Sequence, residues 1–341
     1  MPHNKAPNYA PMSKSYSILF LLFGWLCACD TSPRTVKRGE VVNLYSNALT
    51  ASDQALFTPF EQASGIRVNI INDAGENILA RIRQHQGDSL NADVLLLEGI
   101  NYLQQAKQQA LLDTLPNNSF SSAIPANLRD EDGQWLGLGY SAFAIAYRRD
   151  SVDTLQIQRY QQLADGQWQN KVRVMGSSRR FYPSLLASMI ADEGREETES
   201  WFNTMLQHQE GTADSLALIK LVNTATYTPT AENNRKRVNT AAEGLLFPGP
   251  ETYLHISGAA IQADAPHPER AQALFNYLFS RDFMQQYAEK HRLYPSRPDV
   301  RTPTALARSV RFQADTTAQS RIARFAGDAL SLLGQKSTFN P

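Results

Sequence analysis

The fold is decided by the stretch Ala92-Asp93-Val94-Leu95-Leu96-Leu97, a nearly continuous apolar run of strand length. A run without polar alternation is typical of a parallel strand buried on both faces. Two earlier β-branched segments, Val41–Tyr45 and Arg67–Ile71, also have the character of strands. Because helical segments alternate with such strands, we predict an α/β fold with largely parallel sheets.

Helical spacing is clear on both sides of this run. Leu56 and Phe60 belong to an expected helix that Ser52 caps, Pro59 kinks and Gly65 ends. A later helix carries an apolar stripe at Ala271, Leu274, Phe275, Leu278 and Phe279, and Ser280 is the expected cap of the helix after it. Further strands are expected at Phe143–Tyr147, Val172–Met175, Leu218–Val222 and Gly244–Phe247.

Composition limits the classes of function. The chain has 341 residues, with 33 Lys+Arg against 33 Asp+Glu, and 42% of its residues are hydrophobic. This length predicts two globular domains. A balanced charge gives no basic surface excess for nucleic acid, so we expect no nucleic-acid partner. Two cysteines are too few for a disulfide scaffold or a cysteine-rich zinc module.

The N-terminus carries the pattern of an export signal. The apolar run Ile18–Leu26 is too short to span a bilayer but fits the hydrophobic region of a signal peptide. Ala28 then precedes Cys29, which resembles a bacterial lipobox. We predict a lipoprotein signal peptide at residues 1–28, lipidation of Cys29 and a polar tether over residues 29–40. Ordinary secretion with two free thiols is the open alternative.

No catalytic constellation emerges from the motifs. The stretch Gly137-Leu138-Gly139-Tyr140-Ser141-Ala142 matches a dinucleotide fingerprint, but a strand is expected after it, where the fingerprint needs a helix. No P-loop or H-E-x-x-H motif occurs. We therefore expect a protein that is not an enzyme. Five histidines follow the signal peptide, each expected at the surface rather than as a ligand: His85, His208, His255, His267 and His291.

Ordered segments from residue 41 to Pro295 resemble one family. They include Val42-Asn43-Leu44-Tyr45-Ser46, Ala92-Asp93-Val94-x3-Glu98, Ala123–Asp130 followed by Gly133-x-Trp135-x-Gly137-Leu138, Ser184–Ile190 and His255–Ala259. The chain is similar to the periplasmic ferric-iron-binding proteins of ABC importers, within the extracellular solute-binding family. The resemblance implies two α/β lobes joined by a hinge, with the ligand in the cleft between them.

The resemblance also implies organisation and cellular role. Lobe one is expected at residues 41–141 plus 252–330, and lobe two at residues 142–251. The protein would act as a monomer that binds ferric iron, or an iron–anion complex, and delivers it to an ABC permease. Asp30 after Cys29 resembles an inner-membrane retention signal, so a periplasmic location anchored to the inner membrane is expected.

Single residues of the metal site are only partly retained. Glu98 matches the family's acidic ligand, whereas no histidine follows the first strand. Ala225 and Thr226 stand where the family has paired tyrosines, so the candidate phenolates are Tyr182 and Tyr227, each one residue from a family position. Iron binding weaker than in a family member with the full set, with a faint or absent visible band, is expected.

The residues that match the family's anion contacts are better retained than the metal ligands. Ser177, Ser178 and Asn223 match family contacts to a synergistic anion such as phosphate or carbonate, and Arg179 adds positive charge. The expected ligand is therefore Fe³⁺ with an anion. Two alternatives stay open, namely a different small anion in the same cleft and a receptor-like lipoprotein that has lost its metal.

Overall fold

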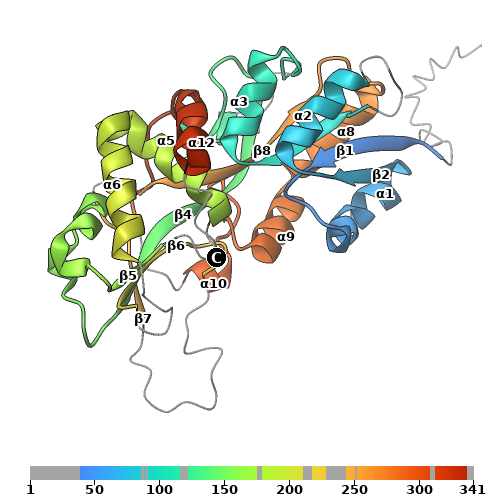
Figure 1. Ribbon diagram of the computed structural model, residues 1–341. Coiled ribbons are helices and arrows are strands. Elements are labelled where there is room, and N and C mark those ends of the chain that lie inside the picture. The colour runs from blue at the N-terminus through green and yellow to red at the C-terminus, as the bar shows by residue number, and fades with distance from the viewer. Residues whose placement is uncertain are drawn as a thin grey trace, which may run out of the picture. The chain divides into compact units, whose positions relative to one another are not determined.

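The computed structural model describes residues 39–85, 88, 91–115, 122–174, 179–209, 217–227, 243–249, 252–307 and 312–335 (Figure 1). The predicted signal peptide, its lipidation site Cys29 and most of the predicted tether lie outside the described residues. Within the described ranges, no helix has both the length and the apolar character needed to cross a bilayer.

A single curved sheet runs through the molecule in the strand order β2-β1-β3-β8-β4-β6-β5, with β7 and β9 also pairing with β4. The strands are β1 (Val41–Ser46), β2 (Arg67–Asn72), β3 (Val94–Glu98), β4 (Leu136–Arg148), β5 (Val172–Arg173), β6 (Ile219–Asn223), β7 (Glu243–Leu246), β8 (Leu254–Ile261) and β9 (Tyr294–Pro295).

The expectation of largely parallel sheets is wrong. Parallel pairing occurs between β1 and β2, β1 and β3, and β5 and β6. Strand β8 runs antiparallel to both of its neighbours, β3 and β4, and β4 is antiparallel to β6. Two long strands, β4 and β8, therefore lie side by side through the centre of the molecule and connect its two halves.

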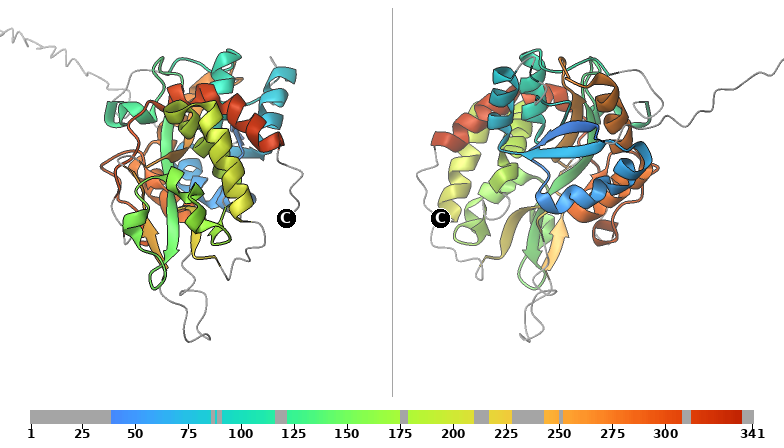
Figure 2. Two further views of the ribbon diagram at one scale, coloured as in Figure 1. Left: turned by 60° about the vertical axis from the view of Figure 1, so that its left-hand side comes forward. Right: turned by 90° about the vertical axis from the view of Figure 1, so that its right-hand side faces the viewer.

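Helices cover the sheet (Figure 2). The α-helices are α1 (Thr58–Ser64), α2 (Gly75–Gln84), α3 (Ile100–Gln108), α5 (Tyr182–Glu193), α6 (Arg195–His208), α8 (Pro268–Leu278), α9 (Arg281–His291), α10 (Thr304–Ala307), α11 (Gln319–Ile322) and α12 (Ala326–Gln335). The 3₁₀ helices are η1 (Ala51–Phe57), η2 (Ala126–Leu128), η3 (Thr154–Gln156), η4 (Tyr160–Ala164), η5 (Gly166–Trp168), η6 (Arg179–Phe181) and η7 (Ala323–Phe325).

The predicted kinked helix is two helices. Pro59 lies in the first turn of α1, where its missing N–H group leaves no intrahelical bond unmade, so the preceding turns form η1. Thr50, not Ser52, is the cap of η1, because Asp53 reaches back to its backbone N–H. Gly65 ends α1 as expected, with a left-handed φ of 68°.

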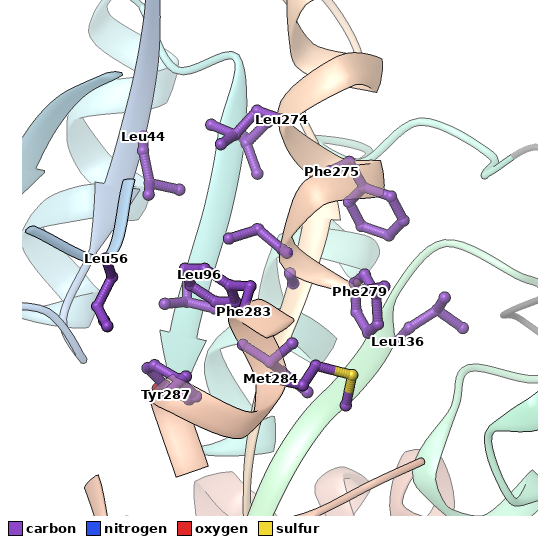
Figure 3. Packing of buried hydrophobic residues seen from close by; sticks show 14 of the residues in the cluster. Leu44, Leu56, Leu96, Leu136, Leu274, Phe275, Phe279, Phe283, Met284 and Tyr287 are labelled. Atoms are coloured by element: carbon purple, nitrogen blue, oxygen red, sulfur yellow. The ribbon is translucent and has the colours of Figure 1, made fainter. Parts of the chain in front are cut away.

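Three hydrophobic clusters lie against the sheet. Alternate residues of β3 enter opposite faces, because Leu96 belongs to the first cluster and Leu95 to the third. Figure 3 shows the first cluster, in which Leu274 of α8 lies toward β3, whereas Phe275 and Phe279 lie toward Leu136 of β4. Strand β4 passes from the first cluster at Ala142 to the second at Phe143.

The C-terminal helices pack with the second cluster. Ile322, Ala329 and Leu332 are buried there, and α12 lies beside α5 in Figures 1 and 2. The predicted lobe division placed residues up to 330 in lobe one, whereas this packing joins α11 and α12 to the half that contains α5.

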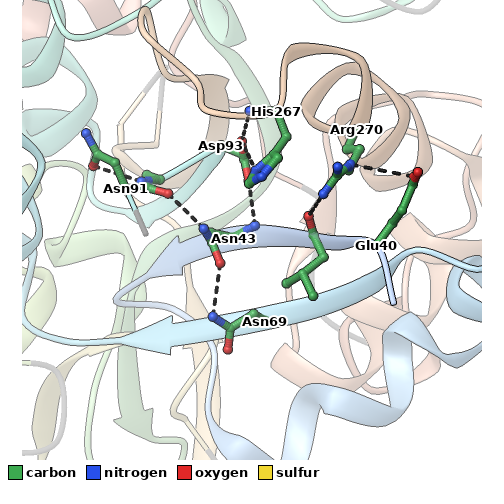
Figure 4. Close-up of polar contacts among 9 residues, drawn as sticks. Glu40, Asn43, Asn69, Asn91, Asp93, His267 and Arg270 are labelled. Carbon is green, nitrogen blue, oxygen red and sulfur yellow. Dashed lines mark hydrogen bonds and ion pairs between the residues drawn. The ribbon is translucent and has the colours of Figure 1, made fainter. Parts of the chain in front are cut away.

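A buried network of hydrogen bonds connects the N-terminal ends of β1, β3 and α8 (Figure 4). The Asp93 carboxylate is fully buried and accepts from the backbone N–H groups of Asn43 and His267, each at 2.8 Å. The His267 ring lies 3.1 Å from the same carboxylate. Asn43 also donates to the backbone oxygen of Asn91 and accepts from Asn69. This network connects three elements beside the end of β8, where the Gln262 N–H donates to the backbone oxygen of Asp93 at 3.1 Å.

Candidate functional site

A cavity of about 190 Å³ opens where η1, the ends of β3 and β8, α9 and η6 meet. Most of its lining comes from the half that contains the first cluster, and Arg180 reaches it from the half that contains α5. The lining residues are Ala48, Thr50, Ser52, Asp53, Glu98, Arg180, Ser257, Tyr287, Lys290, His291 and Leu293. The cavity thus lies between elements of both halves.

Glu98 ends β3 with its carboxylate at the cavity. Its backbone N–H donates to Asn47 Oδ1 at 2.7 Å, and Gly99 turns the chain away with a φ of 95°. Arg180 Nη2 lies 3.6 Å from Glu98 Oε1. Burial raises the pKa of Glu98, and the Arg180 charge opposes that rise only in part. The carboxylate is therefore poorly hydrated and gains from a cation.

Asp53 supplies a second carboxylate in the cavity wall, and both of its oxygens already have hydrogen-bond or ion-pair partners. It accepts from the Thr50 backbone N–H at 2.7 Å and the Thr50 hydroxyl at 2.9 Å. Lys290 Nζ and His291 Nε2 lie 2.8 and 3.1 Å from its other oxygen. Burial raises the pKa of Asp53, but the hydrogen bonds from Lys290 and Thr50 outweigh it and the pKa is lowered overall. Asp53 is thus an anchor between η1 and α9.

His255 stands behind Glu98 on β8. It is 4% exposed, and its Nδ1 atom lies 2.8 Å from the hydroxyl of Ser184 on α5. Its Nε2 atom lies 3.8 Å from Glu98 Oε1 and has no hydrogen-bond partner among the described residues. Burial, assisted by the Arg180 charge, lowers the pKa of His255 to about 3. The imidazole is therefore neutral at any ordinary pH.

The structure separates the predicted metal ligands. Glu98 faces the cavity, but Tyr182 is fully buried in the second cluster, 6.2 Å from the Phe202 ring. Tyr227 is also buried, and its hydroxyl donates to Glu243 Oε2 at 2.9 Å. Neither tyrosine lines the cavity, so the sequence-based choice of these two phenolates does not fit the observed packing. Each tyrosine lies one residue from the position that the family resemblance implies, and its side chain is buried in the protein.

The predicted anion contacts are only partly described. Ser177 and Ser178 lie outside the described residues, and of Arg179 only the backbone, at the start of η6, is described. Asn223 is fully buried at the end of β6, where its side-chain oxygen accepts from the Ala225 N–H at 3.0 Å. The neighbouring Arg180, 60% exposed at its side chain, is the arginine that lines the cavity.

Sequence reasoning missed several lining residues. The expectation that all five histidines lie at the surface is wrong for His255 and His208, which are buried, and His291 lines the cavity. Tyr287 and His291 are four residues apart on α9, a spacing that places both on one helix face. That spacing is the signal that could have found them, although nothing in it indicates which pocket the helix faces.

The donor set favours a charged, oxygen-rich ligand. In the part of the chain that the structure describes, no three His, Cys, Asp or Glu side chains cluster closely enough to bind a metal by themselves. The cavity instead combines one under-solvated carboxylate with the cationic groups of Arg180 and Lys290. Such a mixture suits a cation that arrives together with an anion.

Comparison with known proteins gives a consistent result. The family model for a bacterial extracellular solute-binding protein matches residues 90–315. Iron uptake protein A2 of Synechocystis is 29% identical over 329 residues, which cover 91% of this chain and 93% of that protein. A Trichodesmium protein solved with iron and citrate ligands is 26% identical, with a TM-score of 0.74 over 86% of this chain and 98% of that one.

A Bordetella ferric binding protein is 27% identical, with a TM-score of 0.73 over 88% of this chain and the whole of that one. The predicted two-lobe α/β architecture is therefore confirmed.

Proposed function

Because the chain belongs to the bacterial extracellular solute-binding proteins, we propose that it captures ferric iron as an iron–anion complex in the cavity beside Glu98. The similar proteins named for iron uptake and ferric binding support this cargo. As a binding protein it would deliver the complex to an ABC permease. Iron is here the cargo and the anion completes its coordination.

One observation carries the proposal. The Glu98 carboxylate is largely removed from water, with a pKa raised by burial, and its nearest charge is an exposed arginine from the other half of the molecule. A trivalent cation offsets the desolvation of such a carboxylate far better than solvent does. When the metal binds the carboxylate, Arg180 is available to the anion that accompanies the metal, whereas Lys290 stays paired with Asp53.

The experiment is a binding titration with three probes. Wild-type protein is titrated with ferric citrate, with citrate alone and with ferric nitrilotriacetate, while bound mass is followed by native mass spectrometry. We expect both iron complexes to bind and citrate alone to bind at least tenfold more weakly. Citrate binding equal to that of ferric citrate would instead support a site for a small anion, and no binding would support the receptor-like alternative.

A matched pair of variants localises the site. Glu98→Gln keeps the size of the side chain and removes its charge, so we expect iron binding to weaken at least tenfold. Glu243→Gln is the control, because Glu243 is likewise partly buried, lies 3.1 Å from Lys220 and does not line the cavity. Equal losses in the two variants would contradict the assignment of the cavity.

We also propose how the chain is organised around this site. Lobe one comprises residues 41–141 and the segment from 252 to about 318, and lobe two comprises residues 142–251 with α11 and α12. The change in cluster between Ala142 and Phe143 supports this division. The monomeric protein would be held at the periplasmic face of the inner membrane through a lipid on Cys29.

A further inference from the structure

Three groups near the cavity share one face of the sheet. Ser257 lies directly opposite Glu98 in the antiparallel pair of β3 and β8. His255 precedes Ser257 by two residues on β8, so its side chain projects from the same face. Figure 1 shows that α9, which carries Tyr287, lies close to this end of the sheet.

Of the two ring nitrogens of His255, one has a hydrogen-bond partner among the described residues and the other has none. The Nδ1 atom is held by the Ser184 hydroxyl at 2.8 Å, whereas the Nε2 atom is buried without a described partner and faces Glu98 Oε1 at 3.8 Å. A buried polar atom without a hydrogen-bond partner destabilises the folded protein. If Ser184 accepts from Nδ1–H, the Nε2 lone pair faces the carboxylate, an arrangement that a cation between them would stabilise.

Tyr287 adds a phenol from the other side of the cavity. It lines the cavity and hydrogen-bonds to Ser257, the residue paired with Glu98. A phenol carries its proton at neutral pH, so a metal that binds its oxygen displaces that proton.

We propose that Glu98, His255 and Tyr287 are the protein ligands of the ferric ion, a set built from different positions than the family histidine and tyrosine pair that this chain lacks. This inference rests on the proposed function, because it assigns the ligands of the same cargo. Each supplies a donor that suits iron: a carboxylate oxygen, an imidazole nitrogen and a phenolate oxygen. On binding, the O–H bond of Tyr287 breaks, its oxygen binds the metal and the proton leaves to solvent or to the accompanying anion.

The distance between Glu98 and His255 fits this role after a small movement. Two donors about 2.1 Å from one octahedral metal lie roughly 3 Å apart, compared with 3.8 Å between Glu98 Oε1 and His255 Nε2. Closing that gap requires less than 1 Å of side-chain movement. Arg180, which now lies 3.6 Å from Glu98, would turn to the anion because its side chain is mostly exposed.

The other polar groups of the cavity are less suited to bind the metal. Asp53 already accepts from Thr50, Lys290 and His291, so a metal there would have to break an existing network. His291 is engaged with Asp53 through its Nε2 atom, the nitrogen that faces the cavity wall. The unengaged nitrogen of His255 therefore distinguishes it from the other nearby imidazole.

Two spectroscopic signatures test the assignment on the detergent-extracted full chain loaded with ferric citrate. Pulsed EPR should show ¹⁴N modulation from an imidazole, and the visible spectrum should show a phenolate-to-iron band. His255→Gln should abolish the modulation, and Tyr287→Phe should abolish the band. The controls are His208→Gln, another buried histidine, and Tyr227→Phe, the phenol predicted from sequence. Neither control should change its signal.

Ser184→Ala keeps the imidazole but removes its support. It should retain the ¹⁴N modulation and weaken iron binding about 10- to 100-fold, the usual effect of losing a partner that orients a ligand. This variant keeps the test decisive if His255→Gln does not fold. Modulation that persists in folded His255→Gln, or a band lost in Tyr227→Phe, overturns the assignment.

Iron binding by the wild type without ¹⁴N modulation or a phenolate band refutes this ligand set but leaves the proposed function intact. Wild type that binds no ferric complex refutes both.

Discussion

Replacing Asp53 by asparagine should destabilise the protein by about 2–4 kcal/mol at neutral pH. The carboxylate is 1% exposed and accepts four hydrogen bonds or ion contacts, from Thr50 (two), Lys290 and His291. An asparagine can still accept from Thr50, but its NH₂ group then faces the Lys290 ammonium. Breaking a buried ion pair costs about 3–5 kcal/mol, and the 36% exposure of Lys290 reduces that figure.

The stability that Asp53 contributes should depend on pH. Although burial raises the pKa of Asp53, the hydrogen bonds from Lys290 and Thr50 lower it overall below its usual 3.8. The stabilisation by a carboxylate with a lowered pKa is present above the unfolded value and is lost as the pH falls through the folded value. The difference between wild type and Asp53→Asn should therefore be constant above about pH 5 and shrink at pH 3.

Urea unfolding followed by circular dichroism at pH 7 and pH 3 measures both effects. Asp73→Asn is the control, because the partly exposed Asp73 carboxylate accepts hydrogen bonds from the nearby Ala74 N–H and Asn77 amide and forms no ion pair among the described residues. It should leave the unfolding midpoint nearly unchanged. A difference for Asp53→Asn below about 0.5 kcal/mol at pH 7, or one equally large at pH 3, would refute the view that this ion network fastens η1 to α9.

Three further outcomes are expected. Cys29→Ser should move the protein from the membrane to the soluble periplasmic fraction, and an unchanged membrane fraction with no acyl mass on the wild type would contradict the lipid anchor. X-ray scattering should show a smaller radius of gyration with ferric citrate than without it, and identical curves at saturation would exclude lobe closure. Burial raises the pKa of Glu98 above its ordinary value of 4.5, so acidification should weaken iron binding at a higher pH than it would for an ordinary carboxylate. Equilibrium dialysis measures this binding, and a loss confined to pH values below 4.5 would contradict the expectation.

Local sequence patterns predicted several elements of the fold, but neither the strand β8 nor the directions of the strands. The run Ala92–Leu97 forms β3, and the apolar stripe of α8 is buried as its spacing requires. The direction of β8 between β3 and β4 could not be inferred, because its eight residues are all buried and show no alternation. Hydrophobic periodicity records which face is buried and contains no information on whether neighbouring strands run together or in opposite directions.

For the cavity, too, the sequence identified a residue that belongs to a local motif but not residues that come together from distant segments of the chain. Glu98 could be located because it follows the Ala92-Asp93-Val94 motif and matches the acidic ligand of the family that the sequence resembles. His255 and Tyr287 come from elements more than 150 residues later in the chain. The pairing of β3 with β8 brings His255 to Glu98, and the packing of α9 places Tyr287 in the cavity wall. A lone histidine in an apolar strand such as β8 carries no local sign that its free nitrogen faces a carboxylate.

The two tyrosines show why a near match to a motif does not carry over its chemistry. Tyr182 opens α5 and is buried in the second cluster. Tyr227 lies just after the turn that follows β6, and its hydroxyl bonds to Glu243. Neither tyrosine lines the cavity. If iron is bound here, a phenolate must therefore come from another element, and Tyr287 is a tyrosine that the structure places in the cavity wall.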